Sequence, residues 1–196
     1  MKMDFINHYL KQSIHILNHL NIDEINDLVN ELELLQKNRG RLFFLGVGGS
    51  AANCSHAVND FRKLAGIESY APTDNVSELT ARTNDEGWET VFSEWLLTSK
   101  LSSKDAIFIF SVGGGDIEKG VSVNIVNAIQ LAETRGARIL AIVGREQGYA
   151  RRAAHASIVI PNQDPKLVTP LSESFQAVIW HLLVSHPNLK LNETKW

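Results

Sequence analysis

Two histidine–carboxylate pairs in this sequence have the residue types and spacing of a catalytic or metal-binding set. His56 and Asp60 are four residues apart in a segment with helical periodicity, so their Cβ atoms should lie on one face, about 6 Å apart. Glu173 and His181 are eight residues apart in a later helical segment, about 12 Å along its axis. These groups can transfer protons or bind a divalent metal such as zinc. A His and an Asp at the first spacing are commonly a solvated pair or a capped core histidine, so spacing alone leaves the alternatives open.

Two glycine-rich turns each follow a short apolar run and lead into a helical segment. The first is Gly46 to Ser50, and the second is Ser111 to Asp116. Glycine lets a ligand approach the backbone, and the N-terminus of the following helix attracts an anion. Neither turn has the Walker A or the G-x-G-x-x-G pattern, so we expect an anionic small ligand and no nucleotide. The expected binding residues are Gly48, Gly49, Ser50, Ser111, Gly113, Gly114 and Gly115. Asp116 would repel an anion and is expected to cap the following helix.

The apolar runs predict the sheet that positions these turns. They are short and apolar throughout, as in parallel strands buried on both faces, and they cover residues 42–45, 107–110, 139–143 and 156–160, with a weaker run at 69–71. Helical periodicity alternates with them at residues 50–64, 117–135, 147–154 and 172–184, the last preceded by Thr169-Pro170. The alternation predicts an α/β fold with a doubly wound, five-stranded parallel sheet. Both glycine turns then lie at the carboxyl ends of strands, where such sheets bind ligands.

Two further helical segments, residues 5–20 and 24–36, precede the sheet and carry apolar residues on more than one face. No repeat or linker divides the chain, which predicts a single domain over residues 1–196. Within it, residues 1–38 form the N-terminal helices and residues 39–196 the α/β core. The histidines of the first segment, His8, His15 and His19, are expected at the surface.

Composition narrows the class of protein. The net charge of -3 disfavours a nucleic-acid partner held by phosphate neutralisation. No apolar run approaches the length of a membrane span, and the first ten residues do not resemble a signal peptide. The single cysteine, Cys54, is compatible with a reducing compartment. We therefore expect a soluble cytoplasmic protein.

The first glycine turn and its helix resemble a known family. Gly46-x-Gly48-Gly49-Ser50-Ala51-Ala52, followed by His56, resembles the opening signature of the SIS (sugar isomerase) family, and the resemblance extends over nearly the whole chain. It is greatest to the branch that isomerises D-sedoheptulose 7-phosphate to D-glycero-D-manno-heptose 7-phosphate for lipopolysaccharide or capsule synthesis. This resemblance implies a flavodoxin-like SIS fold, an aldose–ketose isomerase and a homotetramer built through the N-terminal helices. It also implies sites between subunits and adds the Asn84-Asp85 segment to the substrate-binding residues.

The resemblance also implies roles for the two histidine–carboxylate pairs. His56 and His181 match the family's two histidines, whereas Asp60 replaces a glutamate and Glu173 replaces a glutamine. Both replacements keep an oxygen ligand, and the second adds negative charge, which favours a cation. We therefore expect a divalent ion, zinc by analogy with some members, held by His56, Asp60, Glu173 and His181. Asp60 or Glu173 would act as the carbon base, with His181 as the acid.

The second glycine turn departs from the family, which usually has several Ser and Thr residues there. Here Ser111 is retained and glycines replace the hydroxyls that follow, although their N–H groups can still form an anion nest. This departure leaves open an isomerase of another sugar phosphate. A non-catalytic SIS protein, such as a regulator that associates with the replication initiator, is the alternative from another class.

Overall fold

Five parallel strands form the centre of the structure, a computed structural model that describes residues 2–194. The strands are β1 (Leu42–Gly46), β2 (Ser69–Tyr70), β3 (Ala106–Ser111), β4 (Arg138–Val143) and β5 (Ala156–Val159). Their order in the sheet is β2-β1-β3-β4-β5, and every neighbouring pair is parallel. This confirms the predicted doubly wound sheet. The strand order reverses between β1 and β3, which places the switch point between the two glycine turns.

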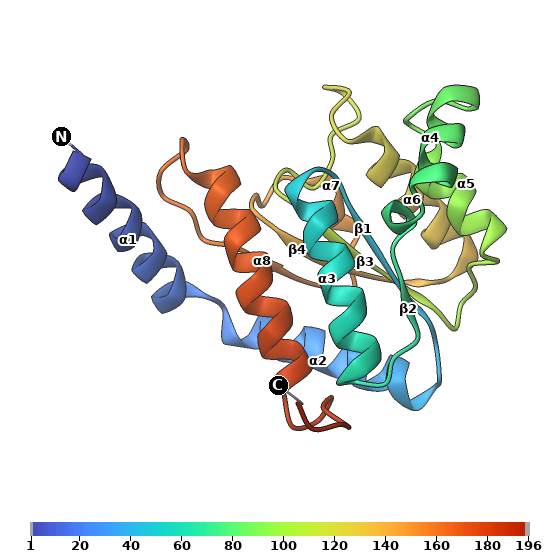
Figure 1. The fold of residues 1–196 in the computed structure, drawn as a ribbon, viewed down its shortest axis with the longest axis horizontal. Helices are drawn as coiled ribbons and strands as arrows, with labels where there is room; N and C mark the ends of the chain where they lie inside the picture. The colour runs from blue at the N-terminus through green and yellow to red at the C-terminus, as the bar shows by residue number, and fades with distance from the viewer. Residues whose placement is uncertain (1, 195–196) are drawn as a thin grey trace.

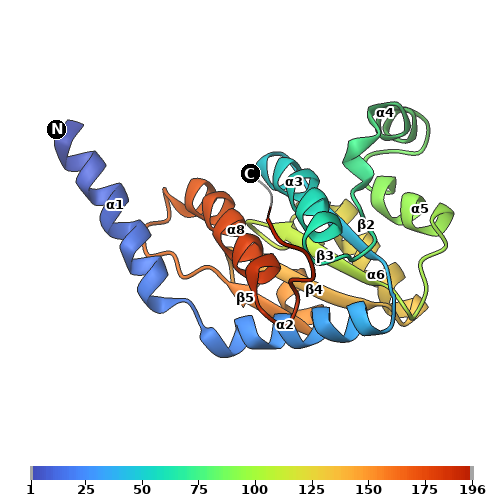
Figure 2. The same cartoon turned by 60° about the horizontal axis from the view of Figure 1, so that its bottom comes forward.

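Helices cover both faces of this sheet (Figures 1 and 2). One face packs against α2 (Ile22–Lys37), α3 (Gly49–Lys63) and α8 (Val168–Ser185). The other packs against α5 (Val91–Thr98), α6 (Val123–Arg135) and α7 (Tyr149–Ala153). Successive strand residues point to opposite faces, so Phe44 joins the first core and Phe43 the second. Two covered faces explain why the strands are apolar without alternation.

The first helix, α1 (Lys2–His19), extends away from the body of the molecule (Figures 1 and 2). His8 contacts the segment before α8 through Nε2, 2.8 Å from Asp164 Oδ2, and this hydrogen bond lowers the pKa of Asp164. Ile16 is fully buried. Five apolar side chains of α1 are each more than half exposed: Phe5, Ile6, Leu10, Ile14 and Leu17.

The segment between β2 and α5 folds into a 3-10 turn, η1 (Pro72–Asp74), and helix α4 (Val76–Asp85). We did not predict α4 or α5 from the sequence. Helix α4 buries none of its residues, so it lacks the apolar stripe on which the recognition of a helix depends. Its start is nevertheless well capped, since Asn75 Oδ1 accepts the N–H of Glu78.

Two predicted helix boundaries were wrong. The helix expected over 117–135 begins at Val123, because Asp116 and Val121 exchange two backbone hydrogen bonds and close residues 117–120 into a turn. The last helix begins at Val168, four residues earlier than expected, and so contains Thr169-Pro170 in its first turn. Proline is tolerated there because the first N–H groups of a helix have no intrahelical acceptor.

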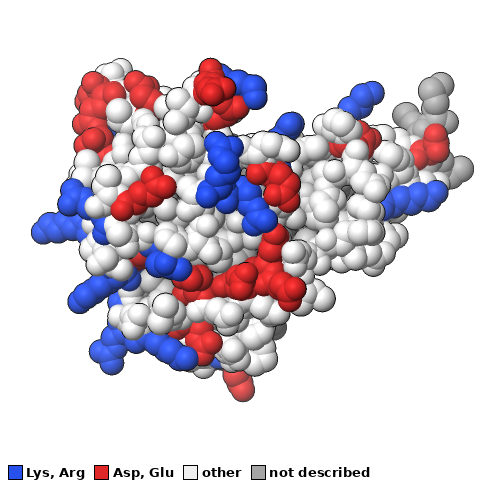
Figure 3. All heavy atoms as spheres, turned by 180° about the vertical axis from the view of Figure 1, so that it is seen from behind, with Lys and Arg blue, Asp and Glu red and all other residues white. Residues whose placement is uncertain are grey.

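Charged side chains are distributed over the surface without one dominant sign. On the face opposite to that of Figure 1, Lys and Arg alternate with Asp and Glu, and acidic side chains gather at the edge that α4 forms (Figure 3). None of the helices described has the length and apolar character needed to cross a bilayer.

Candidate active site

The structure brings three of the four predicted metal-binding side chains together. His56 and Asp60 lie on α3 and His181 on α8, and one nitrogen or oxygen atom from each lies within 4.8 Å of the others. His56 Nε2 is 3.5 Å from Asp60 Oδ2, and His181 Nε2 is 3.4 Å from the same oxygen. The two imidazoles are about half exposed, whereas the carboxylate is nearly buried. The cluster is therefore open on its histidine side.

Neighbouring side chains fix the Asp60 carboxylate. Trp180 Nε1 donates to Oδ2 over 3.1 Å, and Asn59 Nδ2 donates to Oδ1 over 2.9 Å. Trp180 is itself almost completely buried and stacks on Phe110 of β3. Since the indole N–H can only donate, Trp180 holds the carboxylate as an acceptor directed toward the two imidazoles.

These donors fit a divalent ion. Two ligands that are each about 2.0–2.2 Å from a tetrahedral ion lie about 3.3–3.5 Å apart, close to the two Asp60–histidine separations. His181 Nδ1 lies 2.7 Å from the carbonyl oxygen of Ala177. A carbonyl only accepts, so Nδ1 carries the proton and Nε2 keeps its lone pair for a metal or a substrate proton. Three protein ligands with an open side are typical of catalytic sites.

Glu173, the fourth predicted ligand, lies outside this cluster. Its carboxylate lies over Gly49, the first residue of α3, and an ideal Cβ added to Gly49 would be 2.5 Å from Glu173 Oε2. A negative charge at a helix N-terminus is favourable. The position that we expected to bind an anion is thus occupied by a carboxylate of the chain itself. A side chain at position 49 would displace this carboxylate.

A buried polar network joins α3 to α8 beside Glu173. Gln176 Nε2 donates to Ser50 Oγ over 3.0 Å, and Asn53 Nδ2 donates both to Gln176 Oε1 and to the carbonyl oxygen of Glu173, each over 2.8 Å. Gln176 and Ser50 are almost fully buried. Ser50, which we predicted to bind the ligand, is therefore engaged in holding the two helices together. Sequence reasoning missed Asn53 and Gln176, because nothing in their spacing distinguishes them from other polar helix residues.

The second glycine turn forms a separate nest at the N-terminus of α6. Ser111 Oγ accepts the N–H of Gly114 over 3.0 Å, which leaves its own hydroxyl proton free. Gly114 and Gly115 have φ values of +74° and +83°, a region that favours glycine. A Cβ added to Gly113 would meet nothing within 4 Å, so open space lies beside it. The turn can therefore receive an anion.

The prediction that Asp116 caps α6 was wrong. Its carboxylate instead accepts from the backbone N–H and the ammonium group of Lys119, at 3.1 and 2.9 Å, and these bonds lower its pKa. Ser122 is the residue that precedes the helix, with φ at +50° and no side-chain capping bond. We missed Ser122 because the predicted helix already included it. A serine directly before the apolar periodicity of α6 was the available signal.

A comparison of the sequence with models of known families decides the family. The SIS domain model matches residues 8–144. The chain belongs to the SIS domain family. The chain is 31% identical over 191 residues to the phosphoheptose isomerase of Sulfurimonas denitrificans, covering 91% of each chain. It is 34% identical over 158 residues to the lincomycin biosynthesis protein LmbN of Streptomyces lincolnensis, covering 75% of this chain but only 56% of LmbN.

A solved structure shares the fold. The phosphoheptose isomerase of Neisseria gonorrhoeae superimposes with a TM-score of 0.81 at 20% identity, over 94% of this chain and 97% of that chain. The shared fold confirms the flavodoxin-like SIS architecture expected from the sequence.

The Asn84-Asp85 segment, predicted to bind substrate, is not brought to the cluster. Both residues lie at the exposed end of α4, and Asn84 Nδ2 donates to Asp85 Oδ1 over 2.7 Å. Helix α4 lies on the other side of the molecule from α8 (Figure 1). Within one chain these two side chains serve no site that includes His56, Asp60 and His181.

Proposed function

We propose that this chain is an aldose–ketose isomerase that converts D-sedoheptulose 7-phosphate to D-glycero-D-manno-heptose 7-phosphate. The cluster of His56, Asp60 and His181 carries the proposal, because a protein that only binds sugars has no use for it. The relatedness to a phosphoheptose isomerase over 91% of both chains supports the substrate. The product would enter the synthesis of a heptose-containing lipopolysaccharide or capsule.

The two parts of the site suggest how the substrate lies. Its phosphate group would bind at the glycine nest, where Ser111, Ser122 and the N-terminus of α6 offer hydroxyl and N–H donors. The reacting carbons C1 and C2 would then face α3 and α8. Since Glu173 already occupies the N-terminus of α3, the phosphate would not bind there.

The residues of the cluster would hold a zinc ion. His56 Nε2, Asp60 Oδ2 and His181 Nε2 are the proposed ligands. Zinc bound there supplies a Lewis acid that polarises the carbonyl and hydroxyl oxygens of the substrate. Asp60 is fixed by Trp180 and shared between both histidines, so it is poorly free to remove a proton.

Glu173 is the better carbon base. Its carboxylate has no side-chain hydrogen bond to any residue described and lies at the open glycine turn. Glu173 would remove the proton from C1 of the ketose and return it to C2 of the enediol, giving the aldose. The hydroxyl proton would pass from O1 to O2 of the enediol without His181, because the Nε2 lone pair of that residue is committed to the metal.

We further propose that the protein is a homotetramer whose N-terminal helices form contacts between subunits. The five exposed apolar side chains of α1 support this, as do Val178 and Leu182, which flank His181 and are 43% and 39% exposed. A second copy covering these groups would also shield the cluster from water. Light scattering should then give the mass of four chains, and Leu10→Glu with Ile14→Glu should reduce it. A monomer with full activity would contradict the proposal.

The activity is tested by incubating the zinc-loaded protein with D-sedoheptulose 7-phosphate in D2O and recording NMR spectra. We expect the heptose 7-phosphate to appear with deuterium at C2. Conversion of another ketose phosphate, but not of D-sedoheptulose 7-phosphate, would support the isomerase reaction and show that the proposed substrate is wrong. Absence of exchange into any sugar phosphate would instead favour a non-catalytic SIS protein.

A further inference from the structure

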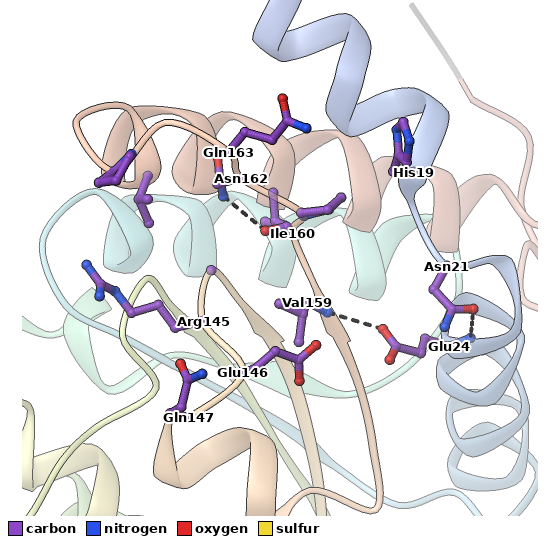
Figure 4. A pocket seen from close by; sticks show the side chains of 14 residues that line it. His19, Asn21, Glu24, Arg145, Glu146, Gln147, Val159, Ile160, Asn162 and Gln163 are labelled. Carbon is purple, nitrogen blue, oxygen red and sulfur yellow. Dashed lines mark hydrogen bonds between the residues drawn. The ribbon is translucent and has the colours of Figure 1, made fainter.

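A pocket lies beside the glycine nest, since Gly144 of its lining donates its N–H to the carbonyl oxygen of Val112. It has a volume of about 460 Å³ and lies beyond the carboxyl ends of β4 and β5 (Figure 4). That volume is within the range of small-molecule sites. None of its lining residues belongs to the His56 cluster or to the glycine nest. On α8, Ser172 packs against Gly144 of this pocket, whereas its neighbour Glu173 faces Gly49.

Three segments far apart in the sequence surround the pocket (Figure 4). They are the loop after β4, the segment after β5 and the junction of α1 with α2, which contribute mainly polar groups: Arg145, Gln147, Asn162, Gln163, Asn21 and Glu24. In Figure 4 the loop after β4 lies across the pocket from the α1–α2 junction. Amides and carboxylates of this kind suit a ligand with many hydroxyl groups.

The wall of the pocket is fixed before any ligand arrives. The Glu24 carboxylate accepts from Arg151 over 2.6 Å and from the backbone N–H of Val159 over 3.2 Å. Arg151 also donates to Ser157 Oγ over 2.7 Å and pairs with Glu146 at 3.3 Å. These bonds join α2, α7 and β5. Because these side chains are already ordered, ligand binding would carry a smaller loss of conformational entropy.

Two polar groups of the pocket remain without partners in the part of the chain described. Asn162 Nδ2 donates to the carbonyl oxygen of Ile160 and to Ser172 Oγ, which leaves its shielded Oδ1 with no donor. A buried acceptor without a donor is costly. Arg145 forms no ion pair or hydrogen bond with any described residue, whereas Glu24 and Glu146 are both paired with Arg151. Arg145 therefore gives the pocket a cation that is unpaired among the described residues, whereas Asn162 Oδ1 is shielded from a ligand in the pocket.

We propose that this pocket is a second binding site, which takes a small polyhydroxylated anion such as a sugar phosphate or a sugar acid. The anionic group pairs with Arg145, and hydroxyl groups of the ligand bond to the exposed side-chain amides of Gln147 and Gln163, which line the pocket. The pocket shares no lining residue with the isomerase site proposed above.

Isothermal titration with D-glucose 6-phosphate, D-gluconate and neutral D-glucose tests the proposal on the full-length protein. We expect at least one of the two anions to bind more tightly than D-glucose. Arg145→Met should weaken that binding by about tenfold or more, the size of a lost hydrogen bond to a charged group. Which anion binds distinguishes the phosphate from the acid.

Arg135→Met is the matched control, because it removes the same charge from the end of α6, outside the pocket. It should bind the probe like the unmodified protein, and so should Ser122→Ala, which alters only the proposed phosphate nest. Failure of both anions to bind, or equal binding by Arg145→Met and Arg135→Met, would overturn the site. Loss of probe binding in Ser122→Ala would also overturn it, because the probe would then occupy the nest.

Discussion

The indole N–H of Trp180 donates to Asp60 Oδ2 across the contact between α8 and α3. The residue after Trp180 is His181, whose Nε2 approaches the same oxygen. One turn of α8 thus supplies both a proposed zinc ligand and the group that orients another. Groups that orient metal ligands typically change metal affinity or activity 10- to 100-fold when they are removed.

Trp180→Phe should therefore keep the fold and lose zinc. Phenylalanine fills most of the buried space but cannot donate to Asp60, so zinc affinity and turnover should each fall by about 10- to 100-fold. Metal content after dialysis against a graded chelator gives the affinity. The control is Trp88→Phe, because Trp88 is 41% exposed and lies away from the cluster. Unchanged zinc affinity in Trp180→Phe would show that the hydrogen bond has no such role.

Replacing the proposed ligands should strongly lower turnover and leave the protein folded. Asp60→Asn and His181→Asn are nearly isosteric, and each should lower turnover by at least about a hundredfold. The double variant should be little worse than the worse single one, because groups that act as a unit are not additive. Circular dichroism and light scattering check the fold and assembly. Effects below tenfold would instead indicate a solvated surface pair.

Glu173→Gln separates the base from the metal ligands. Since Glu173 lies outside the three-residue cluster, the variant should bind zinc normally but lose exchange of deuterium into the sugar. Asp60→Asn should lose both. If Glu173→Gln kept normal exchange, Asp60 would be the base, and a zinc-replete but inactive Asp60→Asn would support that assignment.

Ser122→Ala tests the glycine nest. Phosphate binding contributes equally to the ground state and the transition state, so the variant should raise KM by about tenfold with little change in kcat. Ser111→Ala should act in the same direction. Ser103→Ala is the control, since Ser103 is exposed and lies before the amino-terminal end of β3, whereas the glycine turn follows its carboxyl end. A fall in kcat at constant KM would mean that this turn contacts the reacting carbons.

The sheet was predictable from the sequence because its strands are buried on both faces. Phe43 and Phe44 point to opposite cores. That double burial leaves continuous apolar runs, whose short length and β-branched and aromatic residues distinguish them from a buried helix. Helix α4 was not predictable in this way, since it buries nothing.

The site was predictable only in part. The i,i+4 spacing of His56 and Asp60 shows that they share a helix face, but the convergence of His181 depends on how α8 packs on α3. The separate position of Glu173 depends on Gly49, where the absence of a side chain admits the carboxylate. The role of Ser122 depends on the turn closed by Asp116 and Val121. The hydrophobic periodicity of the sequence does not reveal this turn.

The last prediction concerns the stability contributed at the amino-terminal ends of the strands, opposite to the site. Asp105, which precedes β3, is almost fully buried and accepts from Arg41 Nε at 3.0 Å and from a terminal Arg41 nitrogen at 2.8 Å. Ser102 donates to it through its N–H and its hydroxyl, each over 2.9 Å. Burial raises the pKa of Asp105, but the bonds from Arg41 and Ser102 outweigh it and hold the pKa below 3.8.

Because the folded protein holds this carboxylate ionised more strongly than the unfolded chain, the stabilisation is complete above the ordinary pKa of 3.8 and is lost as the pH falls through the lower folded value. Asp105→Asn should lower the free energy of unfolding by about 1.5–3 kcal/mol at pH 7, since it removes charged hydrogen bonds while Arg41 keeps its bonds to the carbonyl oxygens of Ser99 and Lys100. The difference from the unmodified protein should shrink as the pH falls below 3.8. Urea unfolding at several pH values measures it, with the exposed Asp27→Asn as control. A difference that stays constant with pH would mean that Asp105 stabilises the fold through its shape and not through its charge.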